Sequence, residues 1–254
     1  MENPNWRGRL RWFGAEFLVV VTGVLVALAF NAWYQGRQDQ DRAGSYLKRI
    51  DGDLDLMIHD VNTASAFERQ EVADGFFAYG VLSHPADAAA EQKASRALAH
   101  LLVRRTIPTH DGTYRDLIST GDMRLINDEL RNEMVAYFDE ADRLLSVIAK
   151  NNQVFVDDMY GGVMLERGLV MPLKNAEIIS VLVQLEDSLS DHLRGGYADQ
   201  PDRIWSLPAN SADLAAARSV LIQRIRTSLL AERYMAQMLA SARHLKHEIK
   251  QALR

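Results

Sequence analysis

The sequence predicts an all-α protein in which one N-terminal transmembrane helix is followed by an antiparallel helical bundle. Three observations lead to this fold class. A continuous apolar segment covers residues 13–34. Most of the remaining chain has apolar residues every three or four positions, which is the period of an amphipathic helix. The five prolines after the apolar segment all fall between these periodic stretches, where helices are expected to end.

The composition is that of a globular protein with a core, and it excludes several functions. The chain has 254 residues, of which 48% are hydrophobic and 25% are charged. Its net charge of -5 argues against a nucleic-acid partner, because proteins that bind phosphate backbones present a basic surface. The chain has no cysteine, so disulfides, thiolate nucleophiles and cysteine-bound metals are excluded. No cofactor motif is present, and none is expected.

Residues 13–34 are predicted to cross a membrane. At 1.5 Å per residue the segment is roughly 30 Å long, which matches the hydrocarbon core of a bilayer. Its one charge is Glu16, close to its N-terminal end, and Trp12 and Trp33 lie where interfacial aromatic residues are common. A buried core helix would carry a polar stripe over this length. A cleaved signal peptide would end in a small-x-small site, which the residues from Asn31 to Tyr34 do not provide.

The orientation follows from the short N-terminal tail. Positive charges flank the span on both sides, so their number alone does not decide the direction. Export of a tail of about a dozen residues with three arginines is disfavoured, whereas large domains cross membranes largely regardless of charge. We therefore expect residues 1–12 in the cytoplasm and residues 35–254 in the periplasm of a bacterium, with the span in the inner membrane. The flanking charges are Arg7, Arg9 and Arg11 before the span and Arg37, Arg42, Lys48 and Arg49 after it.

One face of the predicted span could pack against a second helix. Glu16, Gly23, Ala27 and Asn31 recur at steps that place them on one side of a helix. Gly23 and Ala27 form a small-xxx-small pair, which allows two helices to approach closely in lipid. The alternative is that these residues are ordinary for a membrane helix, with Glu16 and Asn31 near the headgroups. We call these four residues the packing stripe.

The periodic stretches predict the order of helices after the span. A long helix leaves the membrane and continues past Tyr79, a second follows Pro85 and ends before Pro108, and a short third ends at Gly121. Asn127 caps a fourth helix, which reaches about Met159 before Gly161-Gly162. Residues 163–170 are expected to be a helix end or loop, and residues 197–208 a loop. Two further helices are expected: one from Asn175 to Gly195-Gly196, and a final long helix that begins at Asn210 or Ser211.

Two blocks of the chain resemble a family of uncharacterised bacterial membrane proteins. The first runs from Glu16 to Trp33, and the second from Thr113 to Arg131. The second block is more specific, with Thr120 where a serine is more usual. The positions that match the recurring pattern of the family are Tyr114, Leu117, Gly121 and Ile126. The resemblance implies one N-terminal span and a helical extramembrane domain, and it implies no catalytic residues because the family has no assigned activity.

Two groups of residues suggest metal binding only superficially. His244 and His247 are spaced to share one face of the last helix beside Glu248, but no further ligand motif accompanies them. Near the end of a helix, histidines also interact well with the helix dipole. A second group, Asp51, Asp53 and Asp55, lacks the glycine and glutamate positions of a calcium loop and is more simply a solvated acidic patch. We assign no metal site.

No catalytic constellation is recognisable in the sequence. The pairs Gly161-Gly162 and Gly195-Gly196 lack the flanking features of phosphate-binding loops, so we interpret them as helix stops. The first functional hypothesis is a membrane-anchored, non-enzymatic interaction or scaffold protein that binds an envelope protein or a second copy of itself. A ligand-sensing bundle that acts through a partner is the second hypothesis, and an enzyme with a site assembled from distant residues is the third.

Overall fold

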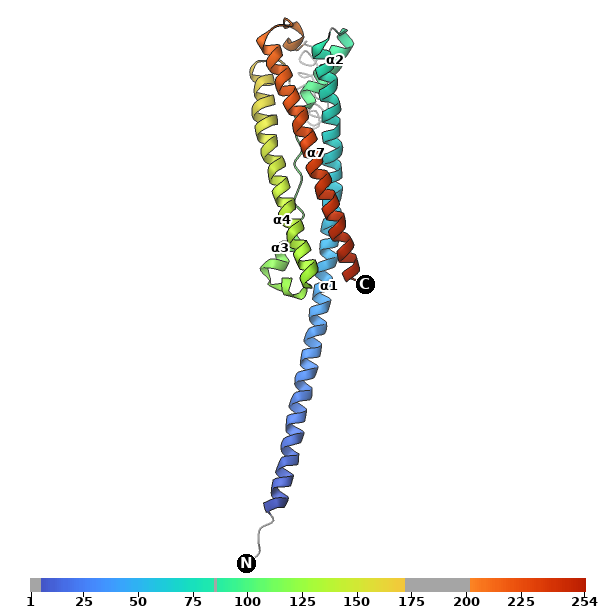
Figure 1. Cartoon of the computed structure of the whole chain (residues 1–254), viewed down its shortest axis with the longest axis vertical. Helices are drawn as coiled ribbons and strands as arrows, with labels where there is room; N and C mark the ends of the chain where they lie inside the picture. Colours follow the sequence, from blue (N-terminus) through green and yellow to red (C-terminus); the bar gives the residue numbers. More distant parts are fainter. Residues whose placement is uncertain (1–5, 85, 172–201) are drawn as a thin grey trace, which may run out of the picture.

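The computed structural model describes residues 6–84, 86–171 and 202–254, and the side chains from residue 17 onward within these ranges. Over this part of the chain every regular element is a helix and no strand is present, which confirms the predicted all-α class. Three long helices form a bundle, and the first of them extends far beyond it (Figure 1).

Helix α1 (Trp6–Ser83) is continuous through the apolar segment and into the bundle. Its first half lies outside the bundle, and eleven large apolar side chains between Phe17 and Tyr34 are each more than half exposed. Among the described residues, this is the one helix that is long and apolar enough to cross a membrane. Farther along the helix, buried residues recur at steps of three and four, so one face packs on the bundle. The first of them are Leu47, Ile50, Leu54, Met57 and Val61.

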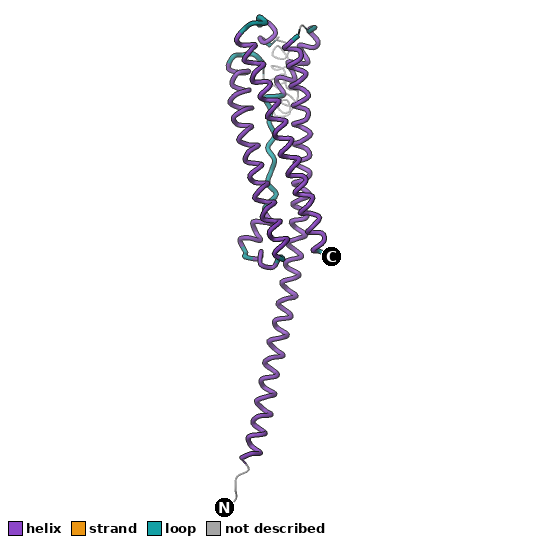
Figure 2. Tube along the Cα trace, in the orientation of Figure 1, coloured by secondary structure: helices purple, strands orange, loops and turns teal. Residues whose placement is uncertain are grey.

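After α1 the chain returns along the bundle mainly as an extended segment. Helix α2 (Ala88–His100) begins with Asp87, whose carboxylate accepts a hydrogen bond from the Ala90 N–H at 2.8 Å. Residues 103–110 then run back beside the long helices without helical structure (Figure 2). The segment leads into α3 (Gly112–Ser119) and η1 (Asp122–Leu125). A bundle position that a helix would ordinarily fill is therefore occupied by extended chain.

Three of the predicted boundaries are confirmed by cap geometry. Gly121 ends the α3 region with φ +74°, a conformation that favours glycine. Asn127 precedes α4 (Asp128–Asn151), and its side chain accepts from the Leu130 N–H at 2.9 Å. Ser211 precedes α7 (Ala212–Ala252) and accepts from the Leu214 N–H at 3.2 Å. Asp111 lies before α3, where its carboxylate accepts from Arg115 Nε at 2.6 Å and makes no capping hydrogen bond to a backbone N–H.

The prediction that Gly161-Gly162 stops a helix is wrong. The chain continues from α4 into a π-helix, η2 (Asn152–Glu166), and passes through both glycines. Gly161 is buried, and a Cβ there would lie 3.3 Å from the Val156 carbonyl oxygen, so glycine relieves crowding inside the wider turn. The chain turns instead at Gly168, with φ +60°. The predicted helix from Asn175 to Gly195-Gly196 lies outside the described residues.

Helix α7 runs antiparallel to α1 and α4 and completes the bundle (Figure 1). It is preceded by a short helix, η5 (Arg203–Ser206), within the stretch that the sequence had suggested to be a loop. The buried apolar residues form two clusters at different heights. One joins α1 residues 47–64 with α4 and the second half of α7, and the other joins the end of α1 with α2, η2 and the first half of α7.

Close contact between α1 and α7 depends on Gly75. A Cβ at this position would lie 2.5 Å from Ile225 Cγ1, so Gly75→Ala forces the two helices or the buried Ile225 side chain to move. We expect Gly75→Ala to lower the free energy of unfolding by about 1–3 kcal/mol. Gly80→Ala is the control, because Gly80 is exposed on the same helix with nothing near its Cβ position. That change should raise the stability by roughly 0.5–1 kcal/mol, as measured by urea unfolding of the full chain in detergent. Equal effects of the two substitutions would contradict the contact.

Candidate functional site

Charged side chains form a buried layer between the two apolar clusters. Glu68 and Glu71 lie on α1 after the first cluster and before the second, and Arg224 and Ser228 lie on α7 at the same height. Arg224 and Glu71 have no exposed surface, and Glu68 is 2% exposed. We call Glu68, Glu71, Arg224 and His100 the buried ion cluster.

Arg224 binds groups from three elements at once. Its Nη2 donates to Glu71 Oε2 at 2.8 Å, and its Nη1 faces Glu68 Oε2 at 3.5 Å and donates to Ser228 Oγ. Nε donates to the Leu101 carbonyl at 3.0 Å, and Nη2 also donates to the Val103 carbonyl at 3.2 Å. These carbonyls follow the last turn of α2, where helix geometry leaves oxygen atoms without backbone partners. Arg224 therefore holds the end of α2 against α1 and α7.

Burial raises the pKa of Glu71 above its ordinary value, while a hydrogen bond with His100 and the positive charge of Arg224 oppose this shift. Nδ1 of His100 lies within ion-pair distance of Glu71 Oε1 and 3.7 Å from Asp74 Oδ2. The arrangement suits a structural clamp with mutually compensated charges.

The sequence held a signal for this cluster that the sequence analysis missed. Glu68 and Glu71 continue the core-facing period set by Val61 and Ala64, so two acidic residues occupy positions that should be apolar. Acidic residues are seldom fully buried without a partner. A buried cation on another helix was therefore predictable, although the sequence could not identify Arg224 among the arginines of the last helix.

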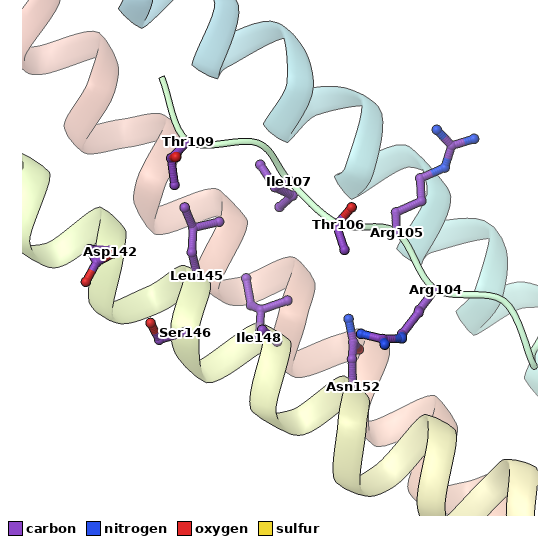
Figure 3. A pocket seen from close by; sticks show the side chains of 11 residues that line it. Arg104, Arg105, Thr106, Ile107, Thr109, Asp142, Leu145, Ser146, Ile148 and Asn152 are labelled. Atoms are coloured by element: carbon purple, nitrogen blue, oxygen red, sulfur yellow. The ribbon is translucent and has the colours of Figure 1, made fainter. Parts of the chain in front are cut away.

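A groove opens where the extended segment lies beside α4 (Figure 3). Its volume is about 280 Å³, and its apolar part comes from Ile107, Leu145 and Ile148. Arg104 and Asn152 lie at one end of the groove, and Thr109 and Asp142 lie at the other (Figure 3). We call this the return-segment groove. Its formation follows directly from the replacement of a helix by the thinner extended chain.

One end of the groove carries an ion pair, and the other end carries an exposed carboxylate. Arg104 Nη2 pairs with Asp157 Oδ2 at 3.0 Å, and both side chains remain more than one-third exposed. The side chain of Asp142 is exposed at the opposite end. Asn152 is 3% exposed, and its amide makes no hydrogen bond with the part of the chain that the structure describes. Arg105 points away from the groove towards α1, where its guanidinium lies 5.2 Å from the centre of the Phe67 ring.

The residues considered for metal binding lie in ordinary surface contacts. His247 Nε2 is 2.7 Å from Gln251 Nε2, and His244 Nε2 is 3.7 Å from Glu133 Oε1, so the two histidines have separate neighbours. Within the described ranges, no three metal-ligating side chains lie together. Asp51 and Asp55 both bind Lys246 Nζ, at 2.6 and 2.8 Å. These two aspartates thus join α1 to α7 and are not simply a solvated patch.

The described part of the packing stripe lies on the free half of α1. Gly23, Ala27 and Asn31 are exposed, and nothing lies within 4 Å of a Cβ built on Gly23. The side chain of Glu16 lies outside the described residues. The stripe therefore has room for another helix at Gly23.

Comparisons of this chain with protein-family models, curated proteins and solved structures return no match.

Proposed function

We propose that this chain is a single-pass protein of the bacterial inner membrane and serves as a non-enzymatic interaction or scaffold protein. Residues 13–34 span the bilayer, residues 1–12 lie in the cytoplasm, and residues 35–254 lie in the periplasm. The observation that carries the proposal is the exposure of eleven large apolar side chains on one continuous helix. A water-exposed apolar surface of this extent is unfavourable, whereas lipid would cover it on all sides.

The continuity of α1 suits a protein that positions an interaction module. Residues 35–46 extend the helix by roughly 18 Å between the proposed span and the first buried residue, Leu47. The bundle would thus be joined to the membrane by an unbroken helix, and its contacts with that helix begin before Leu47, where Arg42 pairs with Asp122 at 3.6 Å. The mutual compensation of charges in the buried ion cluster favours a structural role for those residues. The partners that we propose are the lipid bilayer and either an envelope protein or a second copy of the chain, with no nucleic acid.

A ligand-sensing bundle is the second candidate, and the return-segment groove is the observation that favours it. The groove has polar ends and an apolar middle, which is a common composition for a binding site. A ligand there would contact α4 and the extended segment, both packed near α1. In this role the bundle would act through a partner.

The proposed association is tested by the packing stripe. Gly23→Ile adds a branched side chain where two helices would approach, so self-association should weaken by about 1 kcal/mol or more. Membrane insertion should be unaffected, because isoleucine is favourable in lipid. Val24→Ile, about 100° around the helix, is the matched control. The measurement is the mass of the complex after extraction in mild detergent, together with crosslinking in membranes.

A complex larger than one chain that is lost in Gly23→Ile and kept in Val24→Ile supports association through the span. A larger complex in both variants places the association in residues 35–254 and still supports the interaction role. A single chain without partner, before and after crosslinking, would contradict the proposed function.

A further inference from the structure

We propose that the return-segment groove binds an extended peptide segment of a partner protein, which pairs with residues 104–109 as an added antiparallel strand. This inference rests on the proposed interaction role and specifies the chemistry of the partner.

The backbone of the extended segment is available for pairing. None of its peptide groups from Arg104 to His110 forms a backbone hydrogen bond within the described part of the chain. Most of these residues are exposed or half-buried along the bundle surface. An exposed extended chain with unpaired N–H and C=O groups is the template that strand addition uses. Pro108 removes one donor, as is typical of a strand at an edge.

The side chains of the groove set the length and character of the peptide. Asp142 on α4 and Asn152 at the start of η2 are ten positions apart, which corresponds to roughly 15 Å. An extended peptide advances about 3.3 Å per residue, so a peptide of four or five residues spans the groove. Ile107, Leu145 and Ile148 offer an apolar surface to the middle of such a peptide. Valine, isoleucine and threonine are the residues that favour this extended conformation.

Antiparallel pairing is the more stable of the two senses, and it sets which end of the peptide faces which end of the groove. The return segment runs from Arg104 to Thr109, so an antiparallel peptide begins beside Asp142 and ends beside Arg104. A basic first residue would face the exposed carboxylate of Asp142, and an acidic last residue would approach Arg104, where it shares the guanidinium with Asp157. The amide of Asn152 is open to the same end of the groove and can donate to that acidic group.

The test uses the full chain in detergent micelles and a pool of fluorescent pentapeptides. Each peptide has an acetylated N-terminus, a first lysine, three central residues chosen from valine, isoleucine and threonine, a final aspartate and an amidated C-terminus. We expect saturable binding by fluorescence anisotropy. Asp142→Lys should weaken binding about fivefold, and a pool with the lysine and aspartate exchanged should bind Asp142→Lys more tightly than the native chain. Asp139→Lys, an exposed change on the same helix outside the groove, should leave binding unchanged.

Methylation of the peptide backbone nitrogens separates strand pairing from side-chain attraction. Loss of the pairing N–H groups should weaken binding tenfold or more. Equal binding of methylated and unmethylated pools would overturn the strand model, as would the absence of saturable binding to the native chain at millimolar peptide. Neither result would bear on the proposed membrane anchor, because membrane attachment is measured independently of peptide binding.

Discussion

Arg224→Met should lower the free energy of unfolding of the chain by about 3–5 kcal/mol, because it leaves Glu68 and Glu71 buried without their cation. The carbonyls of Leu101 and Val103 also lose their donor. The length of the side chain is nearly kept, so the expected loss is electrostatic more than steric. Urea unfolding followed by circular dichroism in detergent measures it.

Two further variants make this result specific. Arg226→Met is the control on the same helix, since Arg226 is exposed, and it should change the stability by no more than about 0.5 kcal/mol. Combining Arg224→Met with Glu68→Met and Glu71→Met removes the uncompensated charges and should recover at least half of the loss. A triple variant as unstable as Arg224→Met alone would contradict the charge-based explanation.

The loss of unfolding free energy caused by Arg224→Met should grow with pH. Burial already raises the pKa of Glu71 in the native chain, and loss of the neighbouring cation raises it further. The folded state then keeps its proton at pH values where the unfolded chain has released it. The free energy of unfolding therefore falls as pH rises from the pKa of Glu71 in the unfolded chain through its raised pKa in the folded chain. We expect a smaller deficit at pH 5 than at pH 8, and a deficit independent of pH would argue against the buried carboxylate as its source.

The second large effect concerns membrane attachment. A chain lacking residues 13–34 should move from the membrane fraction to the soluble fraction, because it loses the exposed apolar surface between Phe17 and Tyr34. The intact chain should stay in the membrane pellet after alkaline carbonate, which removes peripheral proteins. Leu25→Ile, a conservative change within the span, should remain in the pellet. Release of the intact chain by carbonate would mean that the helix does not span the bilayer.

Local signals predicted three helix boundaries in the described part of the chain correctly. Asn127 and Ser211 cap helices because their side chains satisfy free N–H groups of the next turn, and Gly121 adopts the conformation that glycine favours. Such effects involve only a few neighbouring residues, so the sequence contains them in readable form. Apolar periodicity likewise predicted the long helix that leaves the apolar segment.

The features that were predicted wrongly or not predicted at all depend on the packed structure. Gly161-Gly162 resembles a helix stop, but η2 continues through both glycines. This helix packs against α2 and α7, and Tyr160 donates a hydrogen bond to the Leu98 carbonyl at 2.8 Å. The buried ion cluster joins Glu71 to Arg224, 153 positions apart in sequence. The return-segment groove exists only because the chain between α2 and α3 lies against α4 in an extended form. The core-facing period makes the burial of Glu68 and Glu71 readable, but each of these contacts joins segments far apart in the sequence, so its partner has no local pattern.

Cysteine labelling tests the central claim most directly, because the chain has no native cysteine. Two single substitutions are compared in cells whose outer membrane has been made permeable: Leu25→Cys within the proposed span and Glu129→Cys on the exposed surface of the bundle. A maleimide that does not cross the inner membrane should label Glu129→Cys in intact cells. Leu25→Cys should react only after denaturation. Labelling of Glu129→Cys only after cell lysis would reverse the orientation, and rapid labelling of Leu25→Cys in native membranes would contradict the membrane anchor.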